Sequence, residues 1–308
     1  MTISKPARAT PTERALFLMA GSALLFGAMA FAAKLASARL SGSQVAMIRF
    51  ATGLLPALLI PRYRRSAFTF QRLDLLFYRG FFGGLAVLCY FVAIAHINVG
   101  VATLLNYTAP LFSGIFSILL LHEHISPKVL LPMPVALAGV FLVVHAHAHP
   151  GDLLGFGKWE LLGLASALFS GAAVTAMRAA RRGENSWAVY TSFCLLGTIL
   201  TAPFAIAGWQ TPTPPEWAAL AATSLFAIGA QLLLTFSLRW VDAMTVGVIS
   251  QLAVVVAMVL GVTLLGESLN ATAIAGAALT IGGVVGVVYV TSWAKRTVVA
   301  ADEVAPEA

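Results

Sequence analysis

The sequence predicts an all-α polytopic membrane protein, in which ten transmembrane helices form two inverted five-helix repeats around a central cavity. Composition is the first observation. Of 308 residues, 59% are hydrophobic and 10% are charged, whereas soluble domains carry roughly 25% charged residues. The second is an internal repeat, since the second half of the chain matches the first at one constant offset. The third is that each half holds five spans, an odd number, so the second half must lie upside down in the same bilayer.

The repeat rests on matched positions and not on general hydrophobicity. The matches include Ser22-Ala23-Leu24 with Ser166-Ala167-Leu168, Gly27-Ala28 with Gly171-Ala172, and Gly139-Val140 with Gly283-Val284. One offset relates them all without a gap, which chance matching of apolar residues would not produce. Inverted repeats allow a transporter to open to either side by exchanging the conformations of its halves. Transport is therefore the leading functional hypothesis.

Ten apolar segments approach the length of about 20 residues that a helix needs to span the hydrocarbon core. The first resembles a signal peptide, but its match to an internal segment indicates a retained helix. The predicted spans are 15–36, 44–60, 77–96, 99–121, 129–146, 158–178, 187–208, 217–238, 243–265 and 271–293. The expected regions are a cytoplasmic tail (1–14), the first repeat (15–146), a periplasmic linker (147–157), the second repeat (158–293) and a second cytoplasmic tail (294–308).

Basic residues are concentrated on one side of the predicted membrane. With the N-terminus in the cytoplasm, most of the 19 lysines and arginines, Arg79 among them, fall on the inner side. This asymmetry follows the positive-inside rule and predicts a multi-pass membrane protein with both termini cytoplasmic. It also explains the net charge of +7 without nucleic acid. All six tryptophans fall at predicted span ends, where indole rings favour the interface.

Two basic residues lie in or near the outer parts of the first two spans. Arg49 is the one charge clearly inside a span, and burying an arginine costs about 2.5–3.5 kcal/mol on insertion scales. It either snorkels outward or pairs with backbone carbonyls, or it faces the cavity and attracts a substrate carboxylate. Lys34 lies near the same level and is expected to be an interfacial residue.

The twelve carboxylates all fall in loops, tails or span ends. Glu123 closes the fourth span and its repeat mate Glu267 closes the ninth. We expect both to cap helix ends or to pair with basic residues, with a gate contact as the alternative. Coupling to protons or cations usually needs an acid within the membrane, so a proton-coupled exporter of cationic drugs is disfavoured.

Polar residues near the middle of the fourth and ninth spans are the main candidates for a substrate site. Thr103, Asn106, Tyr107 and Pro110 share one helix face, and their repeat mates are Gly247, Ser250, Gln251 and Val254. Hydrogen bonding between packed helices is the alternative role of these side chains. The proline is expected to kink its helix and free a carbonyl. Tyr90 and Gln231 are expected to flank the site.

No group of residues predicts catalysis, a cofactor or a metal. His145, His147 and His149 alternate in an outer loop without further ligands. Cys89 and Cys194 fall in apolar runs, which argues against a disulfide framework. The expected partners are therefore a small-molecule substrate and the lipid bilayer. A monomer is expected, and the close glycine spacing in the last span leaves a homodimer as the alternative.

These motifs resemble the drug/metabolite transporter superfamily, specifically its ten-helix members built from two EamA-type repeats, over about residues 15–293. The residues that carry the resemblance are Tyr107-Thr108-Ala109-Pro110-Leu111, Leu121-His122-Glu123, Gly266-Glu267, Lys34 and Arg49. The second repeat departs from the pattern, with Val254 in place of the proline and Phe193 in place of the arginine.

The resemblance implies an inner-membrane carrier that works by alternating access and exports amino acids or related metabolites, with aromatic amino-acid exporters looking most similar. It also implies that spans one, three, four, six, eight and nine line the cavity, with spans five and ten at the periphery. A carrier of organic cations or nucleotide-linked sugars is the runner-up. A membrane sensor or scaffold is the alternative from another class, and an intramembrane enzyme is disfavoured.

Overall fold

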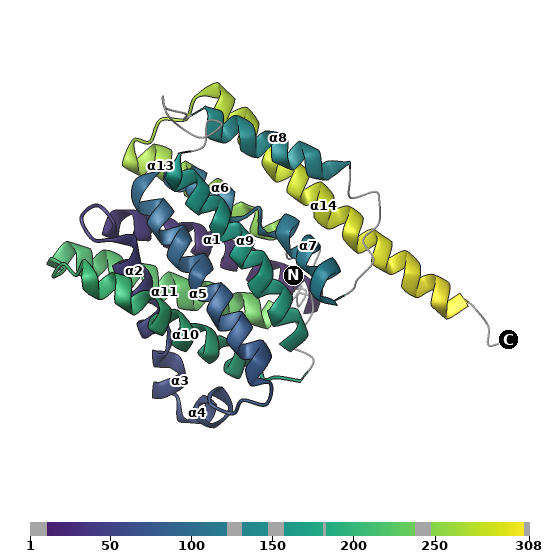
Figure 1. Ribbon diagram of the computed structural model, residues 1–308, viewed down its shortest axis with the longest axis horizontal. Helices are drawn as coiled ribbons and strands as arrows, with labels where there is room; N and C mark the ends of the chain where they lie inside the picture. The colour runs from purple at the N-terminus through teal and green to yellow at the C-terminus, as the bar shows by residue number, and fades with distance from the viewer. Residues whose placement is uncertain (1–10, 122–130, 147–156, 181–182, 238–247, 305–308) are drawn as a thin grey trace, which may run out of the picture.

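The computed structural model describes residues 11–121, 131–146, 157–180, 183–237 and 248–304, and every regular element among them is helical (Figure 1). The helices are α1 (Pro11–Ala36), α2 (Gly42–Gly53), α3 (Leu55–Leu59), α4 (Pro61–Ala67), α5 (Leu73–His96), α6 (Val99–Asn106), α7 (Ala109–Leu121), α8 (Pro132–His145), α9 (Lys158–Ala180), α10 (Ser186–Ala207), α11 (Pro214–Ser237), α13 (Leu252–Leu265) and α14 (Ala271–Val304). Nine spans in the described part are long and apolar enough to cross a membrane, and the shorter apolar helix α8 is a tenth candidate. The predicted all-helical polytopic fold is confirmed.

The described spans follow the predicted ones, with one difference that bears on the site. Helix α5 begins at Leu73 and not at residue 77. Just ahead of it, the backbone N–H groups of Gln71 and Arg72 donate to the Glu184 carboxylate, which satisfies donors that a helix start leaves free. The earlier start places Arg79 deeper in the span Leu73–His96, whereas the sequence analysis puts it at the edge of the span 77–96 and counts it on the inner side.

Close contacts made by glycines reveal the relation between the two repeats. A Cβ at Gly27 of α1 would meet Val256 of α13 at 2.6 Å, and a Cβ at Gly171 of α9 would meet Phe112 of α7 at 2.7 Å. The second pair consists of the repeat mates of the first. Two further pairs of contacts show the same reciprocity. A Cβ at Gly53 would meet Cys194, and a Cβ at its repeat mate Gly197 would meet Phe50. Likewise a Cβ at Gly139 would meet Thr280, and a Cβ at Gly283 would meet Ala136. Reciprocal contacts define a two-fold axis, and five spans in each repeat place that axis in the membrane plane.

Helix neighbours obey the same two-fold relation. Helix α1 packs on α11 as α9 packs on α5, and the pairs α2–α10, α6–α13 and α8–α14 each join equivalent helices of the two repeats. Helices α8 and α14 lie side by side along one edge of the bundle (Figure 1), as the resemblance implies for spans five and ten. The two-fold axis therefore runs between the halves through α6 and α13, where the polar candidates lie.

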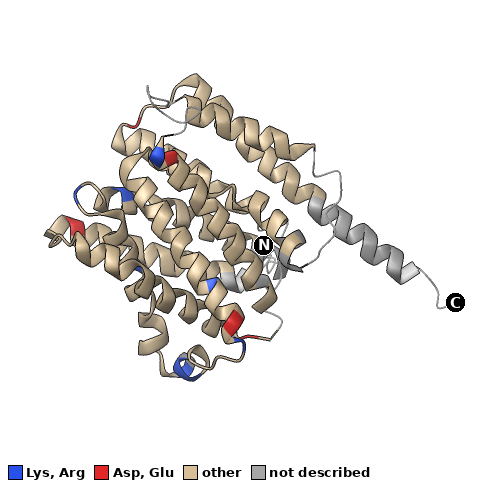
Figure 2. Cartoon of the chain, in the orientation of Figure 1, with Lys and Arg blue, Asp and Glu red and all other residues tan. Residues whose placement is uncertain are grey.

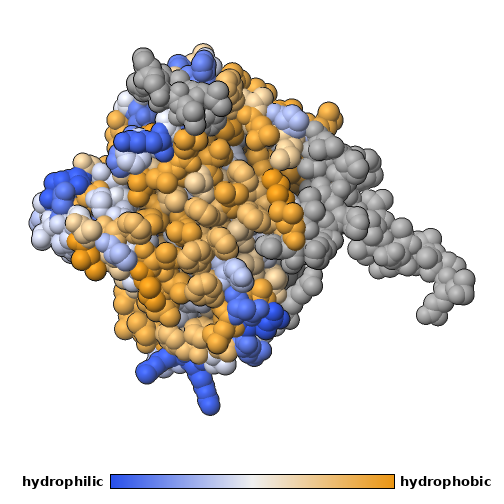
Figure 3. Space-filling model, viewed as in Figure 1, coloured by the Kyte–Doolittle hydropathy of each residue, from blue (hydrophilic) through white to orange (hydrophobic). Residues whose placement is uncertain are grey.

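The surface suits a bilayer. Charged residues lie mostly towards the ends of the helices and in their connections (Figure 2). A broad hydrophobic face separates the hydrophilic regions (Figure 3). Exposed large apolar side chains in the described part of the chain include Phe17, Leu59, Phe204, Ile206 and Leu225. An apolar face of this extent is rare on a soluble monomer and is favourable against lipid.

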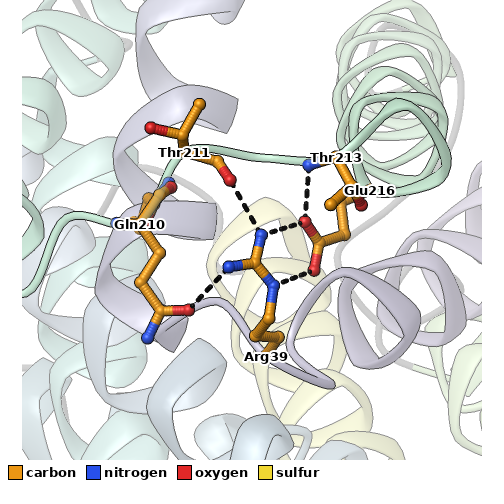
Figure 4. A network of polar contacts seen from close by, with 6 residues as sticks. Arg39, Gln210, Thr211, Thr213 and Glu216 are labelled. Carbon is orange, nitrogen blue, oxygen red and sulfur yellow. Dashed lines mark hydrogen bonds and ion pairs between the residues drawn. The ribbon is translucent and has the colours of Figure 1, made fainter.

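At one end of the bundle, which we call the Arg39 end, a polar network joins the two repeats (Figure 4). Arg39 follows α1, and its Nε and Nη2 donate to the Glu216 carboxylate of α11 at 2.9 and 2.7 Å. It also donates to Gln210 Oε1 and to the Thr211 carbonyl. The hydrogen bond to Glu216 raises the pKa of Arg39. These bonds join the connection between α1 and α2 to the segment ahead of α11 and to its first turn.

Candidate functional site

The fourth span is interrupted near its middle. Helix α6 ends at Asn106 and α7 begins at Ala109, with Pro110 in the first turn of α7. Because proline has no N–H, it cannot continue the hydrogen-bond ladder from α6. The backbone turns instead through Tyr107 and Thr108, whose N–H groups bond to the carbonyls of residues 103 and 105. The interruption lies where the sequence analysis expects a kink.

The ninth span is interrupted at the repeat-related position, although it contains no proline there. Gln251, the repeat mate of Tyr107, separates a helical turn at 248–250 from α13. Tighter bonds appear beside the regular ladder: Gln251 N–H donates to the Val248 carbonyl at 3.2 Å, and the Gln251 carbonyl accepts from Val254 N–H at 3.0 Å as well as from Val255 N–H at 3.4 Å. Discontinuous helices expose backbone polar groups at membrane depth, where such groups occur only if they are buried in protein or line a cavity.

The two interruptions meet across the two-fold axis. Gln251 Nε2 donates to the Tyr107 carbonyl at 3.4 Å, a bond between residues 144 positions apart, which is the repeat offset itself. The side chain of one interruption thus binds the backbone of the other. Gln251 is buried, at 5% exposure, and Tyr107 is half-buried. The carbonyl near the proline therefore has a hydrogen-bond partner in the other repeat.

Asn106 connects the interruption to the other repeat. Its Oδ1 accepts hydrogen bonds from Ser166 Oγ at 3.1 Å and from Ser170 Oγ at 3.2 Å, both on α9. Ser22, the repeat mate of Ser166, also binds the other repeat but at a different place, donating to the Ala230 carbonyl of α11. Asn106 therefore makes the helix–helix hydrogen bonds that the sequence analysis considers as its alternative role.

Tyr90 lies beside the fourth span, as expected. Its hydroxyl is 2.8 Å from Thr103 Oγ1, and Thr103 Oγ1 also lies within hydrogen-bond distance of the Val99 carbonyl. Tyr90 and Thr103 are both buried. The remaining candidates, Gln231 on α11 and Ser250 immediately before the second interruption, are half-buried.

Lys34 and Glu267 hold the turn between α5 and α6, and we call these contacts the α5–α6 clamp. Lys34 Nζ donates to the carbonyls of Ile94 and Ile97 at 2.8 Å each, at the end of α5. Both carboxylate oxygens of Glu267 accept from Val99 N–H, at 2.9 and 3.0 Å, at the start of α6. Each charge thus lies at the helix end that its sign favours.

A glycine turn positions Glu267 in the α5–α6 clamp. Gly266 adopts φ +67° after α13, a left-handed conformation that glycine adopts without steric cost, and this turn directs Glu267 back to α6. Lys34 is thus a helix-capping residue as well as an interfacial one, and Glu267 has the capping role expected of it. Glu123, its repeat mate, lies outside the described residues.

Arg49 lies near the middle of the span Gly42–Leu59 and does not snorkel. Its side chain is buried, at 8% exposure for the residue. The guanidinium carbon lies 5.0 Å from the centre of the Phe50 ring and 5.5 Å from that of Phe193 on α10. Its Nε has no hydrogen-bond partner among the described residues. The expectation that Arg49 snorkels outward is therefore wrong.

Arg79 is a candidate that the sequence analysis missed. Its guanidinium carbon lies 4.0 Å from the centre of the same Phe193 ring. A pattern available in the sequence indicates this placement, because Arg79, Gly83, Ala86 and Tyr90 follow the i, i+4, i+7, i+11 spacing of one helix face. Arg79 and Tyr90 therefore lie on the same face of α5, the face that packs against the other helices.

Two halves related by a two-fold axis, with interrupted helices meeting at that axis, define a membrane transporter. The family model described as EamA-like transporter family matches residues 13–145 and 157–289, and the chain belongs to this family. The protein is therefore a multi-pass secondary transporter of the drug/metabolite transporter superfamily and not an enzyme.

Similar proteins include other transporters. The pseudopaline exporter CntI of Pseudomonas aeruginosa is 29% identical over 257 residues, which cover 83% of this chain and 89% of the exporter. An uncharacterized transporter of Helicobacter pylori is 27% identical over 199 residues, 61% of this chain and 65% of that protein. A solved structure described as "Crystal structure of protein" aligns with a TM-score of 0.59 at 21% identity, over 91% of this chain and 98% of the other, a likeness of fold alone.

Proposed function

We propose that this transporter exports a small polar metabolite, an amino acid or a related compound, across the inner membrane by alternating access. The observation that carries the proposal is the bond between Gln251 and the Tyr107 carbonyl, where the interrupted helices meet. Inverted-repeat carriers bind substrate near the bilayer midplane at the repeat interface, where discontinuous helices supply ligands. Both termini are cytoplasmic in this proposal, as the distribution of basic residues favours.

The substrate site of the proposal comprises the polar residues around the two interruptions. These are Tyr90, Thr103, Asn106, Tyr107, Gln231, Ser250 and Gln251. A substrate that enters replaces Gln251 at the Tyr107 carbonyl, and the released amide becomes a ligand for it. Binding therefore breaks a contact between the repeats, which links occupancy to their relative movement.

The relatives narrow the substrate class without fixing the compound. The relative named as a pseudopaline exporter moves pseudopaline out of the cell, which supports export of a small metabolite here. Neutral and aromatic amino acids remain candidates because amides can bind their charged groups and tyrosines can cover their apolar parts. Organic cations are less favoured, since the described spans offer no mid-membrane carboxylate to bind a cation, and nucleotide-linked sugars remain the alternative.

Counterflow in proteoliposomes tests this function. The vesicles are loaded with one compound from a panel of all amino acids, several organic cations and nucleotide-linked sugars, and uptake of the labelled compound is followed. Saturable counterflow of at least one amino acid or related metabolite is expected. Counterflow restricted to cations or nucleotide-linked sugars would favour the alternative, and no counterflow of any compound would contradict the proposal.

Substitutions locate the site. Gln251→Ala should weaken substrate binding by roughly 0.5–1.5 kcal/mol, the value of one hydrogen bond, and Asn106→Ala should have an effect of similar size. Gln71→Ala is the matched control, because Gln71 is exposed ahead of α5 and only its backbone is bonded. If both variants were well folded and kept wild-type affinity, the site would lie elsewhere.

A further inference from the structure

Two arginines from different helices converge on one aromatic ring inside the bundle. Arg49 of α2 and Arg79 of α5 hold their guanidinium carbons 5.5 and 4.0 Å from the centre of Phe193 on α10. Phe193 packs edge to face against Phe50, with ring centres 5.0 Å apart. We call Arg49, Arg79, Phe50 and Phe193 the arginine cluster. It lies within three of the membrane spans.

The two cations have no acidic partner in the described part of the chain. The ion pairs recorded there are Arg39–Glu216 and Arg72–Asp74, both away from the cluster. The Nε atoms of Arg49 and Arg79 are buried and have no hydrogen-bond partner among the described residues. A guanidinium carries five N–H donors in a fixed plane, and contact with a ring face offers these donors no oxygen acceptor.

The other groups near the cluster do not neutralise it. The side chains that act electrostatically on Arg49 are Cys194, Tyr190 and Tyr90, none of them a carboxylate, and Arg79 is repelled by Arg49 itself. Two like charges are thus held together in a region of low dielectric. Buried charges in proteins are normally paired, so an anion is the group that this arrangement lacks.

The backbone provides space for this arrangement. A Cβ at Gly83 would lie 2.2 Å from Arg79 Nη1 and 2.8 Å from the Phe193 ring, so only glycine leaves room there for the guanidinium. Tyr90 is close enough to Arg49 to interact with it electrostatically, and its hydroxyl is hydrogen-bonded to Thr103 of the proposed substrate site. Tyr90 is therefore a neighbour of both the arginine cluster and the fourth span.

We propose that Arg49 and Arg79 bind carboxylate groups of the transported compound, and that this compound is an organic anion. The proposal rests on the transport function proposed above and specifies its substrate class. Arginine binds carboxylates through paired N–H···O bonds, and two arginines suit a compound with more than one carboxylate. The polar remainder of the anion would extend past Tyr90 to Asn106 and Gln251.

A purely structural role is the competing explanation, in which the arginines brace the helices by stacking on Phe193 and Phe50. The two explanations predict different effects of the ligand's charge. A brace affects folding and affects all ligands alike, whereas an anion site distinguishes an acid from its uncharged amide. Pairs of compounds that differ only in this charge therefore separate the explanations.

The test measures thermal unfolding of the full-length protein in detergent with titrated pairs of compounds: succinate and succinamide, L-glutamate and L-glutamine, and citrate and its triamide. The variants are Arg49→Gln, Arg79→Gln and their Lys counterparts, with Arg64→Gln as the control, because Arg64 is exposed in α4. For wild type and the control, at least one acid should raise the unfolding temperature and its amide should not. The apparent affinity for that acid should fall tenfold or more in both Gln variants and recover in part with Lys.

Each outcome decides the proposal. Acids that fail to stabilise the wild type, or that stabilise the Gln variants equally, would overturn it. Equal responses to acids and amides would show a brace only. If a Gln variant does not fold, the Lys variant gives the comparison, and unchanged acid affinity in both Lys variants would also overturn it.

Counterflow of the same compounds keeps the two proposals separate. Counterflow of acids and neutral compounds alike that does not change in Arg49→Gln or Arg79→Gln would leave the transport function standing and remove the anion site. Acid stabilisation that depends on both arginines, without counterflow of any compound, would support the site and contradict transport.

Discussion

Replacing Gly83 by alanine tests whether the packing of the arginine cluster is as close as the structure indicates. The added Cβ would meet Arg79 Nη1 at 2.2 Å and two atoms of the Phe193 ring at 2.8 Å, distances shorter than van der Waals contact. The guanidinium can move, being the end of a flexible side chain, but the ring is held between helices. Overpacking of this kind costs typically about 1–3 kcal/mol. Gly83→Ala should therefore destabilise the protein by that cost less the roughly 0.5–1 kcal/mol that alanine gains over glycine in a helix.

Gly282→Ala in α14 is the matched control, because a Cβ there would have no atom within 4 Å. Replacing a helical glycine with alanine in open space stabilises by roughly 0.5–1 kcal/mol. The two variants should thus shift the unfolding temperature in opposite directions in one detergent. The displaced guanidinium should also weaken the response of Gly83→Ala to acids. A Gly83→Ala protein with wild-type stability and wild-type acid response would refute the reasoning.

Three further predictions concern topology, coupling and the Arg39 network. Single cysteines at His147 and Lys295 should differ in impermeant thiol labelling of intact cells, with only the first labelled; labelling at 295 would contradict cytoplasmic termini. Glu123→Gln and Glu267→Gln should retain counterflow of a neutral substrate, because the sequence predicts both carboxylates at span ends, and complete loss in a folded variant would overturn this. Arg39→Gln should lower the unfolding temperature less than Gly83→Ala, because exposed ion pairs contribute little; an equal or larger decrease would contradict this.

The repeat offset and the fold were predictable because both depend on patterns that the membrane imposes directly. Apolar length determines the spans, and the offset found in the sequence recurs in the contact between Gln251 and the Tyr107 carbonyl. The interruption near Pro110 was predictable because proline lacks the N–H that a helix requires. Its counterpart at Gln251 was not, since no proline marks it and the turn depends on packing against the other repeat.

The arginine cluster shows where sequence reasoning reaches its limit. Arg79 follows a run of basic residues ahead of an apolar segment, which is typical of a membrane flank. Its burial depends on where α5 starts, and that start is stabilised by Glu184 from the other repeat, a contact distant in sequence. Arg49 was recognised as unusual, but only the position of Phe193 reveals that the two charges share one ring.

The central claim is that the two repeats exchange conformations. Its most direct test uses spin labels at two pairs of sites related by the repeat. The first pair is Asn98 and Ser268, where Asn98 Nδ2 donates to the Ser268 carbonyl beside the α5–α6 clamp. The second pair is their repeat mates, Asp242 and His124, which lie outside the described residues. Distances within each pair are measured by double electron–electron resonance in lipid nanodiscs, with and without Glu267→Gln.

Glu267→Gln removes the negative charge of the clamp and leaves the inner half of the protein unaltered. Alternating access predicts that the Asn98–Ser268 distance lengthens in this variant while the Asp242–His124 distance shortens, so that one end opens as the other closes. A rigid protein would show no change at the second pair, and a loosened one would show both distances lengthening. Either result, in a variant that remains folded, would contradict the exchange of conformations between the two repeats.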